Sequence, residues 1–573
     1  MSPTFAYLKA RSLALIGTRE DYPVAWIVLV VALHLAALGL LIWSEAYAVS
    51  RAAFVLTWGL LNFWWLLLLR RPAASAALSL VLIVLLIILS RFKQETLSMT
   101  ANVVDVMIID DDTISFLLKV LPDLGRTVGI ALALGVPALA LLWRFDPFRI
   151  QVASATRGGV TCLAGLTLLS LVVPADREES FDRSEYVSKF TRSAAVAAID
   201  LMTHGLMESD GDVTDRLAPA VTDACPPARK LPHIVLVLDE SSFDISVAPG
   251  VKVPPDYQRH FRSFDGKKRS LVIEGAGGPT WYTEYNVLTG LSALSYGRFA
   301  EYVTRIAAGR IGRGLPHALH RCGYRTYSLY PWLGSFLGAR NFQTTAGIDH
   351  FLDAKDMGTR DVEPDRFYYD FTADLIKRER GAPLFILTYL MANHWPWTYR
   401  YRDDLAPEWR DLGNGQVDGH RIDEYLRRQT MSARDYTEFV AQLRREYPDE
   451  SFLVVRFGDH QPLFAKHIID PALDEAAIGR QILALDPRFF TTYYAIDVVN
   501  FSPVDLSSAR DTLDAPYLPL IVLEAAGVPI DPSFAEQKKM LHRCRGVFYR
   551  CANGAEARHF NRLLIDSGLI KRL

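Results

Sequence analysis

Long apolar runs dominate the first third of the chain, whereas the remainder mixes polar and apolar residues as a soluble domain does. A helix needs about 20 predominantly apolar residues to cross a bilayer. Runs of this kind lie near residues 24–43, 52–69, 73–90, 126–143 and 158–173, and the last is the shortest. We therefore expect a membrane α-helical domain with five spans over residues 1–176.

The segment after the last run, SEYVSKFTRSAAVAAIDLMTHGL, repeats apolar residues near helical spacing. They are Tyr186, Phe190, Ala194, Ala197 and Leu201. This spacing predicts an amphipathic helix lying on the membrane surface. A linker helix packed on the soluble domain fits the pattern equally well. Because the Pro-rich stretch ACPPARKLP follows, we assign residues 177–230 to a linker.

From residue 233 onward, short apolar runs alternate with helical stretches. The runs HIVLVL (233–238), LVIEG (271–275), LFILTYL (384–390) and FLVVRF (452–457) are typical of strands buried on both faces. Helical stretches such as GLPHALHRC and ARDYTEFVAQLRREY fall between them. Strands that alternate with helices predict an α/β domain with a mainly parallel sheet, here over residues 231–573.

Composition narrows the class of partner. The 573 residues include 62 Lys and Arg against 64 Asp and Glu, a formal net charge of −2. Proteins that bind nucleic acid in bulk need a basic footprint. We therefore expect a membrane protein with no nucleic-acid partner.

Charged residues in the loops predict the orientation of the spans. Basic residues precede the first span and fill the second and fourth loops: Lys9, Arg11, Arg19, Arg70, Arg71, Arg144, Arg149 and Arg157. The other loops carry Glu45 with Arg51, then Asp105 and Asp110 to Asp112, and the acidic PADREESFDR follows the fifth span. Because basic loops stay in the cytoplasm, five spans place everything after about residue 176 outside. An even number of spans would reverse this.

The cysteines are compatible with an external domain. Cys162 lies in the fifth span, and Cys225, Cys322, Cys544 and Cys551 lie in the external part. Oxidising compartments permit disulfides. Cys544 and Cys551 are close in sequence, which favours their pairing, and Cys225 with Cys322 would follow by elimination. Four cysteines allow three pairings, and reduced buried thiols stay open as an alternative.

A polar group follows each predicted strand. Glu240 follows the first run, Thr280 follows the second after AGGP, His394 follows the third, and Asp459-His460 follows the fourth. Ligands of open α/β sheets bind beyond the carboxyl ends of the strands. We therefore expect these side chains to converge on one rim of the sheet, although they are far apart in sequence.

This set of side chains could bind a metal ion and activate a hydroxyl group. Glu240, Asp459 and His460 supply two carboxylates and an imidazole, which suit Zn²⁺ or Mn²⁺. Thr280 could add its hydroxyl, whose alkoxide a bound metal ion favours at neutral pH. A helix that we expect to begin at Trp281 would add N–H groups at the same point, and these would also hold a phosphate.

Each residue also has a structural interpretation. Thr280 alone fits a helix N-cap, although Glu284 comes one residue too late for a capping box. His394 fits a packed core residue, and an Asp-His pair after a strand fits a structural role. Glu240 is harder to explain in this way, because an unpaired buried carboxylate is costly.

Four motifs in order carry a family resemblance. DES (239–241), GGPTWYTEYNVLTG (277–290), NHWPW (393–397) and GDHQP (458–462) resemble the sulfatase/alkaline phosphatase superfamily. More narrowly, the chain is similar to the membrane-embedded phosphoglycerol transferases, which include lipoteichoic acid synthase and the transferases that decorate periplasmic glucans. The resemblance covers essentially the whole chain, since lipoteichoic acid synthase also has five spans, a linker helix and an extracytoplasmic catalytic domain.

The resemblance implies roles for residues within these motifs. It implies the metal ligands Glu240, Thr280, Asp459 and His460, with Thr280 as the nucleophile. It also implies that His394 contacts substrate.

A looser part of the match concerns the headgroup. Arg340 lies where the family has an Arg for phosphate or headgroup contact. The gram-positive synthases have a Trp two positions before that Arg, where this chain has Gly338, and Trp332 is nearby but displaced.

The function implied by the resemblance is metal-dependent transfer of a phosphoglycerol headgroup. Phosphatidylglycerol would be the donor, a phosphorylated threonine the covalent intermediate, and a cell-envelope glycan or glycolipid the acceptor. One divalent ion would be required, Mn²⁺ in the first place, with Zn²⁺ or Mg²⁺ as alternatives. The protein would cross the cytoplasmic (inner) membrane several times, with its catalytic domain on the periplasmic or extracellular side.

The same motifs bear on the other functions that related proteins could suggest. Phosphoethanolamine transferases typically show a G-E-T-x-R run and several disulfides, whereas residues 239–243 read DESSF, without the Gly or the Arg. A lipid phosphodiesterase with water as acceptor is a second alternative. Sulfatases proper need a Cys or Ser that becomes formylglycine, so Thr280 argues against that activity. The complete set of metal ligands argues against a non-catalytic sensor.

Overall fold

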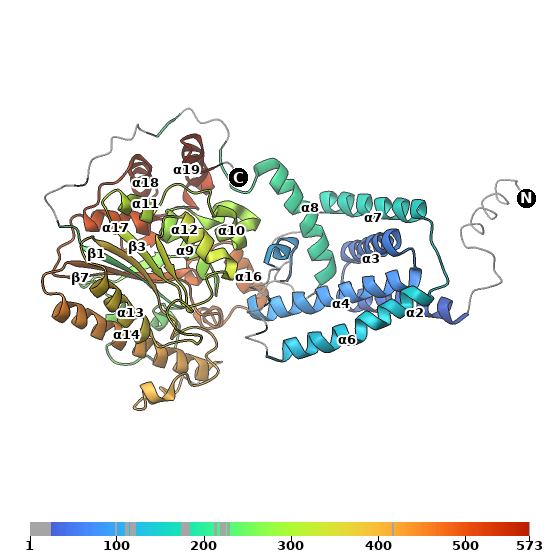
Figure 1. Ribbon diagram of the computed structural model, residues 1–573, viewed down its shortest axis with the longest axis horizontal. Coiled ribbons are helices and arrows are strands. Elements are labelled where there is room, and N and C mark those ends of the chain that lie inside the picture. The colour runs from blue at the N-terminus through green and yellow to red at the C-terminus, as the bar shows by residue number, and fades with distance from the viewer. Residues whose placement is uncertain are drawn as a thin grey trace, which may run out of the picture. The chain divides into compact units, whose positions relative to one another are not determined.

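The computed structural model describes residues 24–97, 100–108, 114, 118, 122–173, 184–210, 215–217, 225, 230–414 and 418–571 (Figure 1). The chain divides into two compact units, Met1–Thr203 and His204–Leu573. Each unit is described by itself. Some charges used above to orient the spans lie outside the described residues, namely Lys9, Arg11, Arg19, Asp110 to Asp112 and the segment 174–183, as does most of the Pro-rich boundary.

The first unit contains the five predicted spans as helices. They are α2 (Val24–Ser44), α3 (Ala48–Leu69), α4 (Pro72–Leu97), α6 (Pro122–Phe145) and α7 (Val152–Val172). Each contains a stretch that is long and apolar enough to cross a membrane. The fifth apolar run, which looked shortest in the sequence, belongs to a helix of 21 residues. It begins at Val152 because Ala and Thr residues ahead of the run continue the helix.

Contacts between loops divide the helix ends of this unit into two groups. The α3–α4 loop meets the α6–α7 loop, where the Ile150 N–H donates to Arg70 O and the Ala73 N–H donates to Asp146 Oδ2 at 2.7 Å. At the other group of ends, the Glu185 N–H donates to Ser44 O at 2.8 Å. The basic second and fourth loops therefore share one end of the bundle.

The predicted amphipathic segment is helix α8 (Tyr186–His204). Its first residues, Tyr186 and Val187, are buried in a cluster with Leu41, Phe54 and Ile83 of the spanning helices. The Thr57 hydroxyl also donates to the Thr191 hydroxyl at 3.2 Å. The start of α8 is thus anchored on the helix bundle.

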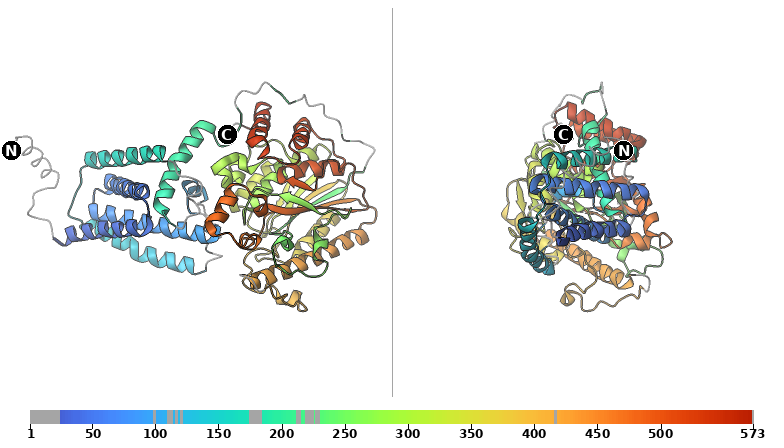
Figure 2. Two further views of the ribbon diagram at one scale, coloured as in Figure 1. Left: turned by 180° about the vertical axis from the view of Figure 1, so that it is seen from behind. Right: turned by 90° about the vertical axis from the view of Figure 1, so that its right-hand side faces the viewer.

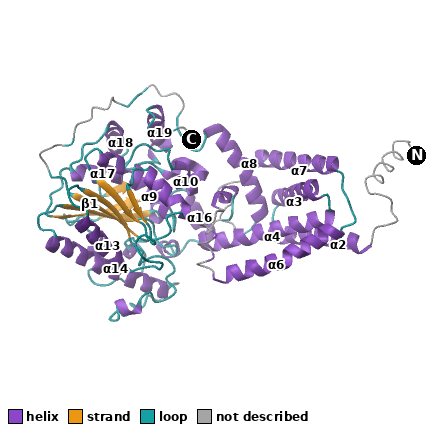
Figure 3. Cartoon of the chain, in the orientation of Figure 1, coloured by secondary structure: helices purple, strands orange, loops and turns teal. Residues whose placement is uncertain are grey.

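The second unit is built on one eight-stranded sheet (Figure 3). Its strands are β1 (His233–Asp239), β2 (Arg269–Val272), β3 (Arg325–Leu329), β4 (His350–Leu352), β5 (Leu384–Tyr389), β6 (Phe452–Gly458), β7 (Thr491–Val499) and β8 (Thr512–Asp514). Their order is β4-β3-β5-β1-β6-β7-β2-β8. Within this sheet β7 alone runs antiparallel to its neighbours. The predicted mainly parallel sheet is confirmed, and the carboxyl ends of the other strands share one rim.

Helices cover both faces of the sheet (Figures 1 and 2). The helices α13 (Asp365–Arg378) and α14 (Gly419–Glu446) cover one face, and α11 (Leu315–His320) and α17 (Leu518–Ala526) cover the other. The remaining helices are α9 (Thr280–Thr289), α10 (Val303–Ala307), α12 (Ala339–Thr345), α15 (Ala465–Ile469), α16 (Glu475–Leu483), α18 (Pro532–Arg543) and α19 (Ala555–Asp566). The central strands β1, β5 and β6 are buried along their whole length, as strands between two helical layers must be.

Two disulfides close the second unit. Cys225 pairs with Cys322 and Cys544 pairs with Cys551, with Cα–Cα distances of 5.4 and 5.7 Å. This confirms the pairing favoured by the sequence. Cys162 is a free thiol.

Candidate active site

Three potential metal ligands meet at the carboxyl ends of two neighbouring strands. β1 and β6 are paired in parallel, with Asp239 opposite Gly458, so the residues that follow them emerge side by side. The ligand atoms of Glu240, Asp459 and His460 all lie within 4.8 Å of one another, and all three residues are buried. The convergence on one rim is therefore present for these three of the expected residues.

The hydrogen bonds of Asp459 leave one carboxylate oxygen turned toward the cluster. Oδ1 accepts the backbone N–H groups of Ser241, at 2.8 Å, and of His460, at 2.9 Å. Oδ2 lies 3.3 Å from His460 Nε2, and among the described residues no donor pairs with it at hydrogen-bonding geometry. A buried oxygen of this kind needs a partner.

The imidazole of His460 presents a second electron pair to the same point. Its Nδ1 bonds to the carbonyl of Gln461 at 2.9 Å, which places the proton on that nitrogen and leaves the Nε2 lone pair facing the carboxylates. Nε2 also lies 3.6 Å from Glu240 Oε1. Burial and the Glu240 charge raise the pKa of Asp459 to about 7, and burial likewise raises the pKa of Glu240. Converging lone pairs and crowded carboxylates fit a divalent cation.

The turn that carries Glu240 is held in an unusual conformation. Ser241 has φ of 52°, in the left-handed region that L-residues rarely adopt. Gly458 allows this turn to approach, because a Cβ there would lie 1.9 Å from Ser242 O. From α14, Tyr425 donates its hydroxyl to Ser241 O at 3.0 Å, and Gln429 Nε2 donates to the Ser242 hydroxyl at 3.0 Å. Neighbouring elements therefore fix the position of Glu240.

Thr280 is the first residue of α9 and is not its cap. Pro279 occupies the N-cap position, and no side-chain capping bond is present there. The structural interpretation of Thr280 as an N-cap is therefore wrong, and the helix begins one residue earlier than expected. The Thr280 side chain is half-buried and lies near Asp459, where it acts to lower the pKa of a carboxyl that burial raises. In addition, the Thr283 hydroxyl donates to Asp459 O at 2.6 Å.

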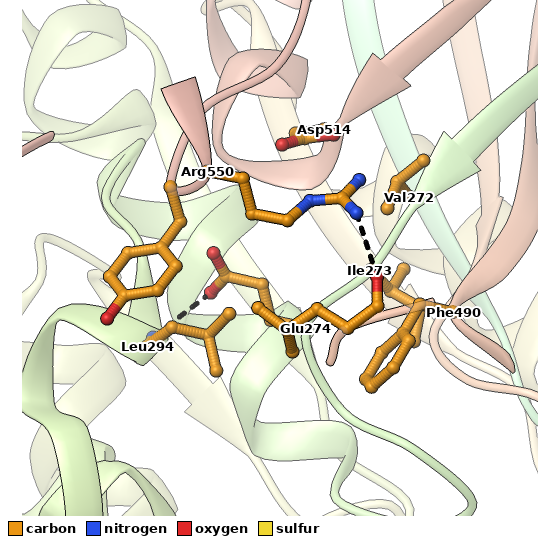
Figure 4. Close-up of a pocket in the computed structure, with 9 residues that line it drawn as sticks. Val272, Ile273, Glu274, Leu294, Phe490, Asp514 and Arg550 are labelled. Atoms are coloured by element: carbon orange, nitrogen blue, oxygen red, sulfur yellow. Dashed lines mark hydrogen bonds between the residues drawn. The ribbon is translucent and has the colours of Figure 1, made fainter. Parts of the chain in front are cut away.

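Glu274 anchors the segment between β2 and α9, a role that the sequence did not reveal. Its carboxylate accepts the side-chain amide of Asn286 at 2.7 Å, the Ser292 hydroxyl at 2.5 Å and the Ala293 N–H at 2.7 Å. Burial raises its pKa to about 7. Figure 4 shows Glu274 beside Arg550, with a hydrogen bond to Leu294, at a cavity of about 20 Å³, which has room for a single water. The metal-cluster residues do not line this cavity.

His394 is half-buried, and the charges of the metal cluster affect the pKa of its ring. Its pKa is lowered by burial and by the charge of His460, although the carbonyl of Trp395 and the charge of Asp459 act to raise it. Nδ1 bonds to Trp395 O at 2.7 Å, so the neutral ring carries its lone pair on Nε2. Backbone N–H groups of Met391 and Ala392 both bond to Asp365 at 3.0 Å, which fixes the start of this loop.

The two predicted headgroup residues have other partners. The Arg340 guanidinium pairs with Asp353 at 2.7 Å and with Asp356 at 2.8 Å, and it stacks over the ring of Phe351. Trp332 is half-buried and packs against the core cluster around β3 and β5. Contact of Arg340 and Trp332 with a phosphate or a headgroup stays a prediction.

A comparison with known families identifies the domain that holds this site. Residues 234–477 match the sulfatase family model. Over these residues the chain is similar to the sulfatase family. Its fold is that of the sulfatase/alkaline phosphatase superfamily, whose members are typically metal-dependent enzymes. With five helices that could cross a membrane, the chain is a membrane protein with a sulfatase-like domain.

A curated relative of this chain is distant in sequence. A "Putative cyclic beta-1,2-glucan modification protein" of Rhizobium meliloti (strain 1021) is 23% identical over 296 residues, which are 50% of this chain and 44% of that protein. This chain thus matches less than half the length of that curated relative.

Solved structures of similar fold include membrane transferases. The phosphoglycerol transferase GacH of Streptococcus pyogenes, solved with sn-glycerol-1-phosphate, shares 14% identity at a TM-score of 0.45, covering 59% of this chain and 85% of GacH. The lipooligosaccharide phosphoethanolamine transferase EptA of Neisseria meningitidis shares 11% identity at a TM-score of 0.43, covering 84% of this chain and 95% of EptA.

Proposed function

We propose that the protein transfers a phosphoglycerol headgroup from phosphatidylglycerol to a glycan or glycolipid of the cell envelope. The observation that carries the proposal is the position of Thr280. Its hydroxyl lies at the first turn of α9, uncommitted to capping and in contact with Asp459, which in turn lies with Glu240 and His460 in a buried cluster. A hydroxyl placed beside a metal site and a helix N-terminus suits nucleophilic attack on a phosphodiester.

The proposed reaction proceeds in two displacements. Thr280 Oγ loses its proton and forms a bond to the phosphorus of the donor, and the bond from phosphorus to the diacylglycerol oxygen breaks as that oxygen gains a proton. The oxygen of the acceptor hydroxyl then loses its proton and forms a bond to the phosphorus, the bond from phosphorus to Thr280 Oγ breaks, and Thr280 Oγ regains a proton. Glu240, Thr280, Asp459 and His460 would hold the divalent ion, which when bound favours the threonine alkoxide and offsets charge on the phosphoryl oxygens.

We assign the second proton transfer to His394. Because its Nδ1 is bonded to Trp395 O and its pKa is lowered, the ring is neutral near pH 7 with Nε2 able to accept a proton. Nε2 would take the proton of the acceptor hydroxyl as the new phosphodiester forms. The alternative role, in which His394 only donates to phosphate, would require the charged ring or the other tautomer.

The turn sequence and the number of disulfides favour a glycerol headgroup over ethanolamine, and a relative favours a glucan as the acceptor. The DESSF turn lacks the Gly and the Arg typical of phosphoethanolamine transferases, and the described residues contain two disulfides. The Rhizobium relative is named for modification of cyclic β-1,2-glucan, which supports a glucan acceptor here.

The spanning helices fit a lipid donor on the outer face of the inner membrane. Each CH₂ group of an acyl chain costs about 0.8 kcal/mol to bring into water, so the active site must come to the lipid. The basic second and fourth loops share one end of the bundle, which supports a cytoplasmic location for that end and a periplasmic location for the catalytic domain.

Mass spectrometry of the protein after exposure to phosphatidylglycerol and Mn²⁺ tests the proposal. We expect a glycerophosphoryl adduct on Thr280 that disappears when a glucan acceptor is added, with transfer of label to the glucan. An ethanolamine adduct from phosphatidylethanolamine would support the phosphoethanolamine alternative. Release of free glycerol phosphate at the same rate with and without glucan would support the phosphodiesterase alternative. No adduct on Thr280 from either lipid would refute the covalent mechanism.

A further inference from the structure

The loop that follows His394 presents two aromatic side chains to solvent. Trp395 and Tyr399 are each 49% exposed, whereas Trp397 and Tyr401, which alternate with them, are buried. Trp397 packs on Phe464 and Tyr425 in the core. Trp397 and Tyr401 thus anchor the loop, whereas Trp395 and Tyr399 are half exposed. The Arg428 guanidinium lies over the Tyr399 ring, 5.2 Å from its centre, so one face of that ring is covered. Exposed aromatic rings that lie together in one short loop are candidates for a binding surface.

A buried ion network on α14 holds the loop rigid. Arg428 donates to the carbonyls of His394 at 2.8 Å, of Pro396 at 2.9 Å and of Tyr399 at 3.1 Å. Glu424 pairs with Arg428 at 2.7 Å and with Arg427 at 3.0 Å, and all three side chains are almost fully buried. Although burial acts to raise it, these hydrogen bonds lower the pKa of Glu424. Buried charges are costly, and here they serve to fix one loop.

Polar groups flank the exposed rings. Arg400, next to Tyr399, pairs with Asp411 at 3.0 Å, and the exposed fractions of these two side chains are 34% and 43%. Arg400 also pairs with the buried Glu424 at 3.3 Å. Thr398 is also exposed. The loop therefore offers flat apolar faces together with hydrogen-bond donors and acceptors.

We propose that Trp395 and Tyr399 form a platform on which a sugar ring of the acceptor glycan stacks, with Arg400 and Asp411 binding its hydroxyl groups. This inference rests on the proposed function and names the part of the site that binds the acceptor. The face of a pyranose ring presents C–H groups that pack on aromatic rings, while its edge presents hydroxyls that need polar partners. The platform holds the acceptor next to His394, whose Nε2 accepts the proton.

The charge around the platform favours a glycan over the acyl chains of a lipid. An acyl chain lying on Trp395 and Tyr399 would cover the Arg400–Asp411 pair with hydrocarbon, and burying such groups without hydrogen bonds from the ligand is costly. A sugar replaces the water around them with hydroxyl groups. Because the backing network is preformed, little ordering accompanies binding.

Binding of a soluble β-1,2-linked glucan to the full-length protein in nanodiscs that lack phosphatidylglycerol tests the platform. We expect Trp395→Ala and Tyr399→Ala each to raise the Kd by about fivefold to tenfold, and Trp395→Phe by about twofold. The Trp395 carbonyl that orients His394 is retained in these variants. Phe264→Ala, which removes an exposed aromatic ring at 46% exposure elsewhere on the domain, is the matched control and should bind as the wild type does.

The outcomes separate the platform from the proposed function. In turnover, the platform variants should raise the KM for glucan more than they lower kcat, and adduct formation on Thr280 in the absence of glucan reports the donor step by itself. If glucan binds through Trp395 but no adduct forms, the proposed function fails and the platform stands. If the adduct forms but neither substitution changes glucan affinity, or if the wild type binds no glucan, the platform is refuted. Loss of adduct formation in Trp395→Ala with unchanged glucan affinity would assign the rings to the lipid donor instead.

Discussion

The hydroxyl of Thr280 is left available by the residue that precedes it. A Thr before a helix is most simply an N-cap, yet Pro279 takes that position and frees the hydroxyl for Asp459. The cluster of Glu240, Asp459 and His460 could be predicted because each residue follows a strand in a parallel sheet. The partners that fix them, Tyr425, Gln429 and Glu274, could not, since nothing in their local sequence shows which distant backbone they contact.

Substitution of Thr280 tests its role as nucleophile. We expect Thr280→Ala to abolish the adduct and to lower headgroup transfer by at least about a thousandfold, whereas Thr280→Ser retains a hydroxyl and measurable transfer. Thr344→Ala, at an exposed position of α12, is the control and should behave as the wild type. Full transfer by Thr280→Ala would exclude the covalent route.

Substitution of Glu240 tests the metal site. Glu240→Gln keeps the shape of the side chain but removes its charge, so we expect metal affinity to fall by about a hundredfold or more. Elemental analysis of the purified protein and thermal unfolding with and without Mn²⁺ measure the effect, because a bound ion at one hundred times its Kd stabilises the fold by about 2.7 kcal/mol. Equal Mn²⁺ stabilisation of the variant and the wild type would place the ion elsewhere.

At the scale of elements, the fully buried strands β1, β5 and β6 were predicted almost to the residue, because continuous apolar runs mark strands between two layers. The short β4 and β8, and β7 with its polar and aromatic mixture TTYYAIDVV, gave no such signal. α14 is far longer than the stretch recognised as helical, because its first half buries Glu424, Arg427 and Arg428, which break the apolar pattern.

The junction of β6 with the turn after β1 should not tolerate a methyl group. In Gly458→Ala the new Cβ would lie 1.9 Å from Ser242 O, so the turn that carries Glu240 must move. We expect the free energy of unfolding to fall by about 3 kcal/mol, with loss of bound metal. Gly266→Ala is the comparison, since Gly266 has φ of +75° but nothing within 4 Å of a Cβ. Because Gly458, unlike Gly266, does not have a positive φ, a loss in Gly458→Ala no larger than that in Gly266→Ala would show that the turn accommodates the added methyl group.

At the scale of the whole molecule, the hydropathy pattern predicted the five helices of the described residues that are long and apolar enough to cross a membrane. The orientation drawn from the loop charges stays a prediction. The sequence could not show how the linker is held, because the contacts of Tyr186 and Val187 with α2, α3 and α4 depend on packing between distant segments.

Several buried carboxyls together predict how stability changes with pH. Burial raises the pKa of Glu274, Glu284 and Asp365 to about 7. The folded state therefore holds protons that the unfolded chain has already lost, so stability falls as pH rises through 7. Between pH 6.5 and 8 the buried histidines stay neutral, so they do not change stability with pH. We expect the melting temperature of the metal-saturated protein to decrease over this interval.

A substitution isolates one of these carboxyls. Glu284→Gln keeps a hydrogen-bonding group beside Gln343 and Tyr389 but cannot ionise, so its melting temperature should fall less steeply over the same pH interval. Each such group contributes at most about 1.4 kcal/mol per pH unit. A melting temperature that rises from pH 6.5 to 8 would contradict the assignment of protonated carboxyls.

The turn of α14 between Glu424 and Gln429 has a consequence for how specificity can change. Tyr425 and Gln429 hold the backbone next to Glu240, while Glu424 and Arg428 hold the loop of His394 and Trp395. Under the proposed function, the residues for donor chemistry and those for acceptor recognition are therefore held by the same turn of one helix. Variants selected for a new acceptor should accumulate at the outward-facing positions 395 and 399 and spare this stretch of helix, since any tilt that reshaped the outer loop would also displace the cation.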